Sequence, residues 1–95
     1  MDYQQIVFSG HAVRQMFARE ISVEDVRMVI TAGATIAEYP DDEPYPSCLL
    51  SGVVRERTIH VVLAYDSETL TGIVVTAYIP DPGFWSSDFR TRRDR

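Results

Sequence analysis

The clearest hydrophobic pattern in this chain lies between Thr58 and Tyr78. Two runs rich in β-branched and aromatic residues, TIHVVLAY and IVVTAY, flank the segment DSETLTG, which is rich in turn-forming residues. This composition is typical of two strands joined by a turn. The stretch therefore predicts an antiparallel β-hairpin at the centre of a sheet.

The register of this hairpin decides which side chains share a face. We take Tyr65 as the partner of Ile73 across the turn. Antiparallel pairing then places His60 opposite Tyr78, and side chains alternate between the two faces. The first face is expected to carry His60, Val62, Thr76 and Tyr78, and the second Ile59, Val61, Leu63, Ile73, Val75 and Ala77. The second face is wholly apolar and suited to burial, so a functional surface is expected on the first.

Two amphipathic helices are predicted before the strands. Ser9 is a suitable N-cap for a helix over Gly10 to Arg19, and Ser22 with Asp25 has the spacing of a capping box for a second helix that ends before Gly33. In the first helix the apolar stripe is Ala12, Val13, Met16 and Phe17, and the polar side is His11, Arg14, Gln15 and Ala18. The short connection between the helices predicts a helical hairpin over a shared core.

The remaining segments complete an α+β domain. TIAEY and CLLSGVV are expected strands, and Arg55 to Arg57 is a tight turn into the central hairpin. The order ααββββ predicts an N-terminal helical hairpin packed on one face of a four-stranded antiparallel sheet. A length of 95 residues fits a single domain, 1–95, in which 1–8 form an arm or short edge strand and 90–95 a basic tail.

Charge and composition narrow the functional classes. The net charge of −5 argues against nucleic-acid binding through bulk electrostatics. The first 89 residues hold five Arg and thirteen acidic residues, whereas RTRRDR at 90–95 holds four Arg. No apolar run is long enough to span a membrane, no secretory signal is visible, and Cys48 is the only cysteine. We therefore expect no membrane association and a cytoplasmic location.

Several ordered motifs resemble one bacterial family, the domain of unknown function numbered 4258. They are SGHAVRQMFARE, ISVEDVRMVITAG, EYPDDEPYPSCLL, TIHVVLAY and IVVTAYIPDP, followed by Trp85 and Arg92. Glu20 departs from the pattern, since members often have Gly there. The family is similar to RelE-like and barnase-like bacterial ribonucleases, many of which are toxins of toxin–antitoxin pairs. The resemblance implies such a fold, RNA as substrate, and a zinc-finger or helix-turn-helix antitoxin as partner.

The candidate face carries groups suited to metal-independent RNA cleavage. His60 can serve as base or acid, Tyr78 can position it or donate a proton, and Thr76 can bond phosphate. His11 is a second candidate base, although the polar side of its helix can point away from His60. The phosphate-binding candidates are Arg14, Arg55, Arg57 and Arg92, with Trp85 as a stacking platform.

Each candidate also has a plainer interpretation. His60 can be a hydrogen-bonded strand residue, Tyr78 a strand former, and Trp85 an aromatic that closes the end of the core. No motif for a metal or cofactor is present, so none is expected. The sequence thus favours a ribonuclease resembling toxins. The alternative is a non-catalytic module that binds a protein through the exposed sheet face or edge.

Overall fold

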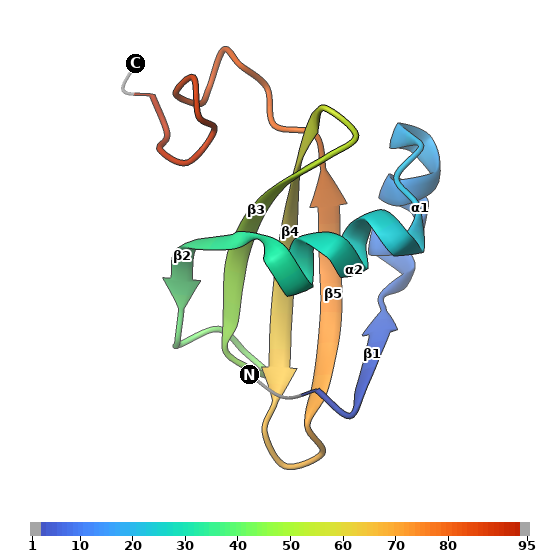
Figure 1. The fold of residues 1–95 in the computed structure, drawn as a ribbon. Coiled ribbons are helices and arrows are strands. Elements are labelled where there is room, and N and C mark those ends of the chain that lie inside the picture. The colour runs from blue at the N-terminus through green and yellow to red at the C-terminus, as the bar shows by residue number, and fades with distance from the viewer. Residues whose placement is uncertain (1–2, 94–95) are drawn as a thin grey trace.

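Two helices cover one face of a five-stranded sheet in the computed structural model, which describes residues 3–93 (Figure 1). The elements are β1 (Gln5–Phe8), α1 (Gly10–Arg19), α2 (Val23–Ala32), β2 (Ala34–Tyr39), β3 (Ser47–Val54), β4 (Arg57–Asp66) and β5 (Thr71–Tyr78). The strand order is β1-β5-β4-β3-β2. The chain is therefore an α+β domain, as predicted.

The N-terminal strand corrects the predicted sheet. Residues Gln5–Phe8 pair in parallel with β5, so the sheet is five-stranded and mixed rather than four-stranded and antiparallel. Ile6 and Phe8 pack against the core, whereas Val7 is exposed. This alternation makes the short segment a half-buried edge strand. Residues 1 and 2 of the expected arm, and 94 and 95 of the expected tail, lie outside the described residues.

The central hairpin keeps the predicted pairing at one end only. His60 lies opposite Tyr78 as expected, but Tyr65 pairs with Gly72 rather than with Ile73. The register shifts because β5 contains one extra residue, Val75, between the partners of Val62 and Leu63. Beyond this β-bulge the faces of β5 are exchanged.

The bulge changes which side chains of β5 enter the core. Val74 is fully buried, whereas Val75 is 38% exposed and Ile73 is half-buried on the other face. The predicted inward positions of Ile73 and Val75 are therefore wrong, while those of β4 are confirmed. The core consists of Ala12, Met16, Ile21, Val26, Val29, Leu50, Val54, Ile59, Val61, Leu63, Val74 and Ala77.

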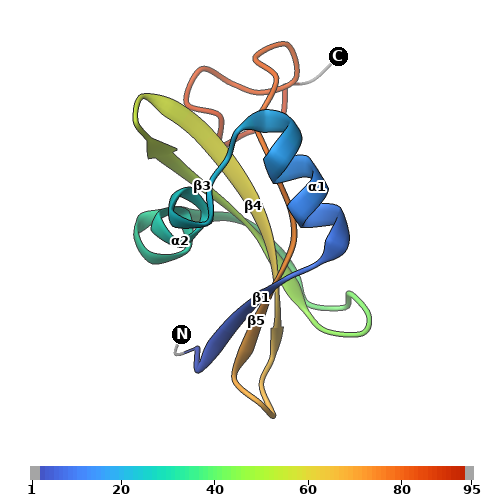
Figure 2. The same cartoon turned by 90° about the vertical axis from the view of Figure 1, so that its right-hand side faces the viewer.

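Both helices lie on the same side of the sheet, here called the inner face (Figures 1 and 2). Helix α1 packs on β5, and α2 packs on β3 and β4. Each helix thus packs mainly on its own strands, and the two helices bury their apolar residues in one core, so the predicted shared core is confirmed. None of the helices in residues 3–93 is long and apolar enough to cross a membrane.

Helix α1 begins as predicted but buries a narrower stripe. The Ser9 hydroxyl accepts a hydrogen bond from the amide of Ala12 at 3.0 Å. Ala12 and Met16 are buried, whereas Val13 is 53% and Phe17 88% exposed. The predicted stripe is therefore confirmed at Ala12 and Met16 and wrong at Val13 and Phe17, because α1 packs on β5 along one row of side chains.

A buried carboxylate begins α2 and joins it to the sheet. Ser22 and Asp25 form the predicted capping box, with both hydrogen bonds at 3.0 Å. Asp25 is 2% exposed and accepts hydrogen bonds from Arg55 at 2.7 and 2.8 Å. Arg57 lies 3.5 Å from the same carboxylate. The carboxylate thus fixes the β3–β4 turn against the helix layer.

The electrostatics of Asp25 follow from these contacts. Desolvation by burial acts to raise the pKa of the carboxyl group, but the Ser22 hydrogen bonds and the Arg55 guanidinium outweigh it and leave the pKa lowered. The turn that carries Arg55 has a positive φ at both central residues, 52° at Arg55 and 69° at Glu56. Two consecutive non-glycine residues in this region carry backbone strain, which the contacts of Arg55 offset.

Gly33 follows α2 as predicted, but not as a left-handed cap. Its φ is −77°, an ordinary value for any residue. Glycine is needed here because a Cβ atom would lie 2.5 Å from the carbonyl oxygen of Val29 and 2.8 Å from that of Ser51. Close packing of the helix end on β3 therefore explains this residue.

Replacing Asp25 with Asn should lower the free energy of unfolding by about 2–3 kcal/mol, because charged hydrogen bonds to Ser22 and Arg55 are lost. Urea denaturation at pH 7 measures the change. Glu24→Gln, in the same helical turn but exposed, is the matched control and should change stability by less than about 0.5 kcal/mol. Equal losses in both variants would contradict this role for Asp25.

Candidate functional site

The face of the sheet away from the helices, here called the outer face, carries the predicted set of polar side chains. His60 lies opposite Tyr78 in the ladder, and Val62 opposite Thr76, so the four share this face as expected. Thr76 is half-buried. The expectation that this part of the face is open to water is wrong, because the chain after β5 folds back over it.

Residues 84–93, here called the C-terminal cap, form a closed loop on the outer face (Figure 2). Trp85 and Arg92 form an antiparallel bridge. The amide of Ser86 donates to the carbonyl of Thr91 at 2.8 Å, and that of Arg93 to the carbonyl of Phe84 at 2.9 Å. Arg93 also binds the carbonyls of Pro82 and Trp85. Residues 90–93 are thus part of a folded element rather than a tail.

The imidazole of His60 is fully buried beneath this cap. Its Nε2 lies 2.8 Å from the carbonyl oxygen of Phe89, and its Nδ1 3.3 Å from the hydroxyl of Tyr78. Because a carbonyl only accepts, Nε2 carries the proton and Nδ1 accepts from the phenol. Trp85 packs edge-on against the ring at 4.6 Å between centroids. Both ring nitrogens are therefore occupied.

Burial sets the ionisation of this pair. Desolvation lowers the pKa of His60, and the Phe89 carbonyl opposes it only in part. Desolvation likewise raises the pKa of Tyr78, so the phenol keeps the proton that it donates to the imidazole. In this arrangement His60 is a neutral, hydrogen-bonded residue that joins the sheet to the cap, as in the plainer of its two interpretations.

A hollow of about 480 Å³ opens between β2 and the cap, and we call it the outer groove. It is lined by Ile36, Ala37, Tyr39, Leu49, Tyr78, Trp85, Arg90, Thr91 and Arg92. Tyr39 is 40% exposed, and Tyr78 is half-buried beside it on the same face. The groove is thus lined by two tyrosines and two arginines, beside β2 at one edge of the sheet.

Three of the predicted phosphate-binding arginines lie elsewhere. Arg55 and Arg57 bind Asp25 on the inner side of the sheet, and Arg57 also donates to the carbonyls of Arg19 and Glu20 at 2.9 and 2.8 Å. They are thus structural ties in this fold, separated from Tyr78 by the sheet. Arg14 is exposed on α1, in the helix layer.

His11 and His60 do not share a site. His11 is exposed in the first turn of α1, which packs on the inner face, whereas His60 points to the outer face. Of the predicted residues, Tyr78, Trp85 and Arg92 are brought together at the outer groove. Trp85 is 7% exposed and packs on His60, and Arg92 lies over the rings of Phe84 and Trp85 at 6.0 and 5.5 Å.

Three residues at this site were not predicted from the sequence. The carbonyl of Phe89 holds His60, and Tyr39 and Arg90 line the outer groove. Phe89 has a left-handed φ of 60°, which no sequence pattern predicts. The available sequence signal that residues beyond β5 cover His60 is a histidine within an otherwise apolar strand, followed by Phe84 and Trp85 after the last strand.

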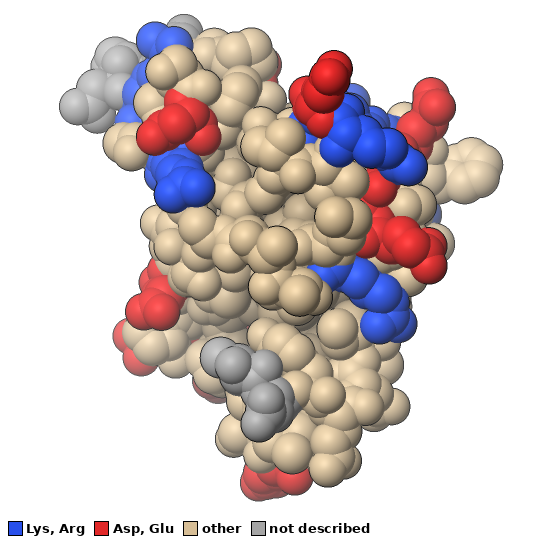
Figure 3. All heavy atoms as spheres, viewed as in Figure 1, with Lys and Arg blue, Asp and Glu red and all other residues tan. Residues whose placement is uncertain are grey.

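The charges on the opposite side do not form a basic surface. Figure 3 views the helix side. Arginine atoms lie beside acidic atoms in mixed groups, and a broad uncharged area separates these groups from one another. Exposed apolar residues of α2 on this side include Val23 and Met28. Phosphate backbones require clustered cations, so this face offers no extended nucleic-acid surface. Within residues 3–93, no three His, Cys, Asp or Glu residues are grouped to hold a metal ion.

The buried imidazole should make folding sensitive to mild acid. His60 has a lowered pKa when folded, so below its unfolded value of about 6.5 the unfolded chain binds a proton that the folded chain excludes. The free energy of unfolding should then fall as the pH drops below 6.5, by up to about 1.4 kcal/mol per pH unit. Urea denaturation between pH 5 and 7.5 measures this slope.

His60→Gln should flatten that slope, whereas His11→Gln should retain it because His60 is still present. An unchanged slope in His60→Gln would show that the imidazole is not the group responsible.

Comparison with known proteins identifies a family for this chain. Neither the curated proteins nor the solved structures contain a match to this chain. A family model described as "Domain of unknown function (DUF4258)" matches residues 8–79, from the end of β1 to the residue after β5. The C-terminal cap follows the matched residues. Because the match covers most of the chain, the protein belongs to the DUF4258 family.

Proposed function

We propose that this chain is a non-catalytic binding module that holds an extended segment of a protein partner in the outer groove. The observation that supports this is the position of the groove, which lies directly beside β2, one of the two edge strands of the sheet. An edge strand offers unpaired backbone groups, and an extended peptide can pair with them as an added strand. Its alternate side chains would then enter the groove.

The groove also suggests what the partner segment contains. Arg90 and Arg92 suit acidic side chains, and the rings of Tyr39 and Tyr78 suit apolar or aromatic ones. Aromatic residues and arginine are the side chains that most often carry affinity in protein interfaces. The preferred segment is therefore extended and acidic, with apolar residues at alternate positions. A small protein encoded by a neighbouring gene, such as an antitoxin, is the first partner to examine.

Binding is favoured over catalysis because of the state of His60. A general base needs a free lone pair within reach of a substrate proton. The imidazole has no exposed surface, and both of its nitrogens are bonded. Tyr78 and Thr76 alone do not supply a base near neutral pH. The outer face is thus better equipped to hold a partner than to cleave one.

Peptides selected from a displayed random library provide the test. Selected sequences should be acidic, and on titration they should shift the amide resonances of β2 and of residues 85–92 in the NMR spectrum. Tyr39→Ala and Arg92→Gln should each weaken binding about tenfold. Arg27→Gln, an exposed change on α2, is the control and should bind normally. Resonance shifts confined to the helices would contradict the proposal.

Ribonuclease activity at a different place is the second candidate, in keeping with the resemblance to RelE-like and barnase-like proteins. His11 and Arg14 are both exposed, one helical turn apart on α1, and neither side chain makes a hydrogen bond or ion pair within residues 3–93. An imidazole and a guanidinium so placed could act on one phosphodiester.

Purified protein incubated with single-stranded RNA tests this second candidate. If it holds, cleavage should fall at least about a hundredfold in His11→Ala, the usual cost of losing a general base. Gln15→Ala, on the same helix, is the control and should cleave normally. RNA that stays intact at high protein concentration would exclude this activity.

A further inference from the structure

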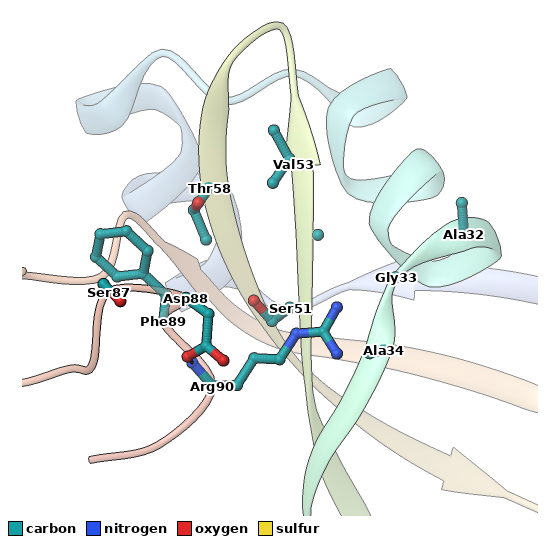
Figure 4. Close-up of a pocket in the computed structure, with 11 residues that line it drawn as sticks. Ala32, Gly33, Ala34, Ser51, Val53, Thr58, Ser87, Asp88, Phe89 and Arg90 are labelled. Carbon is teal, nitrogen blue, oxygen red and sulfur yellow. Dashed lines mark hydrogen bonds between the residues drawn. The ribbon is translucent and has the colours of Figure 1, made fainter. Parts of the chain in front are cut away.

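A second hollow, of about 550 Å³, lies on the outer face beyond the outer groove, and we call it the Ser51 pocket. It is bounded by the end of α2, the start of β2, the outer side of β3 and β4, and residues 87–90 of the cap (Figure 4). Its lining residues are Ala32, Gly33, Ala34, Ser51, Gly52, Val53, Thr58, Ser87, Asp88, Phe89 and Arg90. The function proposed above does not use this pocket.

Ser51 is a buried polar residue without a protein partner. It is 5% exposed, and its hydroxyl makes no hydrogen bond with any residue that the structure describes. Ser51 pairs with His60 in the ladder, so its side chain faces the pocket and not the core. Among the described residues, no side-chain N or O atom that is itself buried lacks a hydrogen-bond partner, so the unpartnered Ser51 hydroxyl keeps access to solvent through the pocket. A hydroxyl left open toward a pocket is therefore available to a ligand.

Arg90 supplies the second open group. Figure 4 shows its side chain extending from the cap toward Ser51 and Ala34. The guanidinium forms no ion pair with a described residue, since the ion pairs of residues 3–93 involve Arg55 and Arg57. Its planar group of N–H donors matches the geometry of an oxyanion. The hydroxyl of Thr58 lines the same pocket and also lacks a described partner.

Asp88 at the same pocket limits the charge of the ligand. Its carboxylate accepts hydrogen bonds from the Ser86 hydroxyl at 2.6 Å and from the amide of Arg90 at 3.0 Å, so its hydrogen bonds come from the cap. These bonds and, to a smaller extent, the charge of Arg90 lower the pKa of Asp88. One negative charge beside one guanidinium disfavours a doubly charged phosphate more than a singly charged carboxylate. A planar carboxylate with a single negative charge therefore fits the Ser51 pocket better than a phosphate does.

We propose that the Ser51 pocket binds a carboxylate group, held by the Arg90 guanidinium and the Ser51 hydroxyl. The carboxylate can belong to a small organic acid or to the acidic side chain or C-terminus of a peptide, and both present the same atoms to these donors. Carboxylate binding in the Ser51 pocket does not depend on the binding of a protein segment in the outer groove. Arg90 lines both hollows, but Ser51 lines this pocket and not the groove.

NMR titration of the 15N-labelled protein with sodium acetate, and separately with an acetylated dipeptide bearing a free C-terminus, tests the proposal. Both should shift the amides of Ser51, Gly52 and Arg90 in a saturable manner. Arg90→Gln should weaken binding about tenfold and Ser51→Ala about three- to tenfold. Arg27→Gln on α2 is the matched loss of an arginine and should bind as the wild type does.

Two further measurements keep the outcome decisive. Ser51→Ala should leave the urea midpoint unchanged without ligand, because the hydroxyl has no partner to lose. A C-terminally amidated dipeptide should fail to bind, whereas acetate acting alone would identify the small acid as the ligand class. Saturable binding of inorganic phosphate in preference to acetate, or no saturable shift with either carboxylate, would overturn the proposal.

Discussion

A buried imidazole must have both ring nitrogens hydrogen-bonded, and the outer face of this protein is arranged around that constraint. His60 points away from the core because Ile59 and Val61 on either side of it point inward. It therefore requires a second layer, which the C-terminal cap supplies through the carbonyl of Phe89 and the ring of Trp85. The cap in turn leaves a hollow on each side of Arg90. The position of the C-terminal cap and the two candidate binding hollows beside it thus follow from one buried side chain, His60.

The same constraint explains why residue types alone suggested catalysis. A histidine, a tyrosine and a threonine on one sheet face are the groups that acid–base chemistry uses. They are equally the groups that a polar contact between two layers uses, because imidazole and phenol can bond to each other and to a carbonyl. Solvent exposure distinguishes the two cases, and here exposure is decided by residues that come after the last strand.

Short-range sequence patterns predicted most helices and strands correctly. The predictions failed mainly where the structure depends on contacts between residues that are far apart in the sequence. The caps at Ser9 and Ser22 and the pairing of His60 with Tyr78 follow from short-range patterns and were confirmed. The bulge at Val75 was not visible, since both Ile73 and Val75 are β-branched and suit either face. The parallel pairing of β1 joins residues some 66 positions apart, and a four-residue strand carries little pattern of its own.

The candidate site was less predictable than the fold for a related reason. Residues 80–93 have no periodicity, so the positions of Phe89 and Arg90 depend on tertiary contacts with β3 and β4. Arg55 and Arg57 looked free in sequence, but Asp25, thirty residues away from Arg55, binds both. Charged residues can be assigned to a ligand only after their intramolecular partners are known.

The attachment of the β3–β4 hairpin on both sides has a mechanical consequence. Asp25 fastens its turn to the helix layer, and His60 fastens its middle to the cap. The central strands are therefore clamped from above and below, whereas β1 and β2 each have a neighbour on one side alone. Any conformational adjustment to a bound molecule should therefore occur in the edge strands β1 and β2, while the central strands β3 and β4 stay rigid.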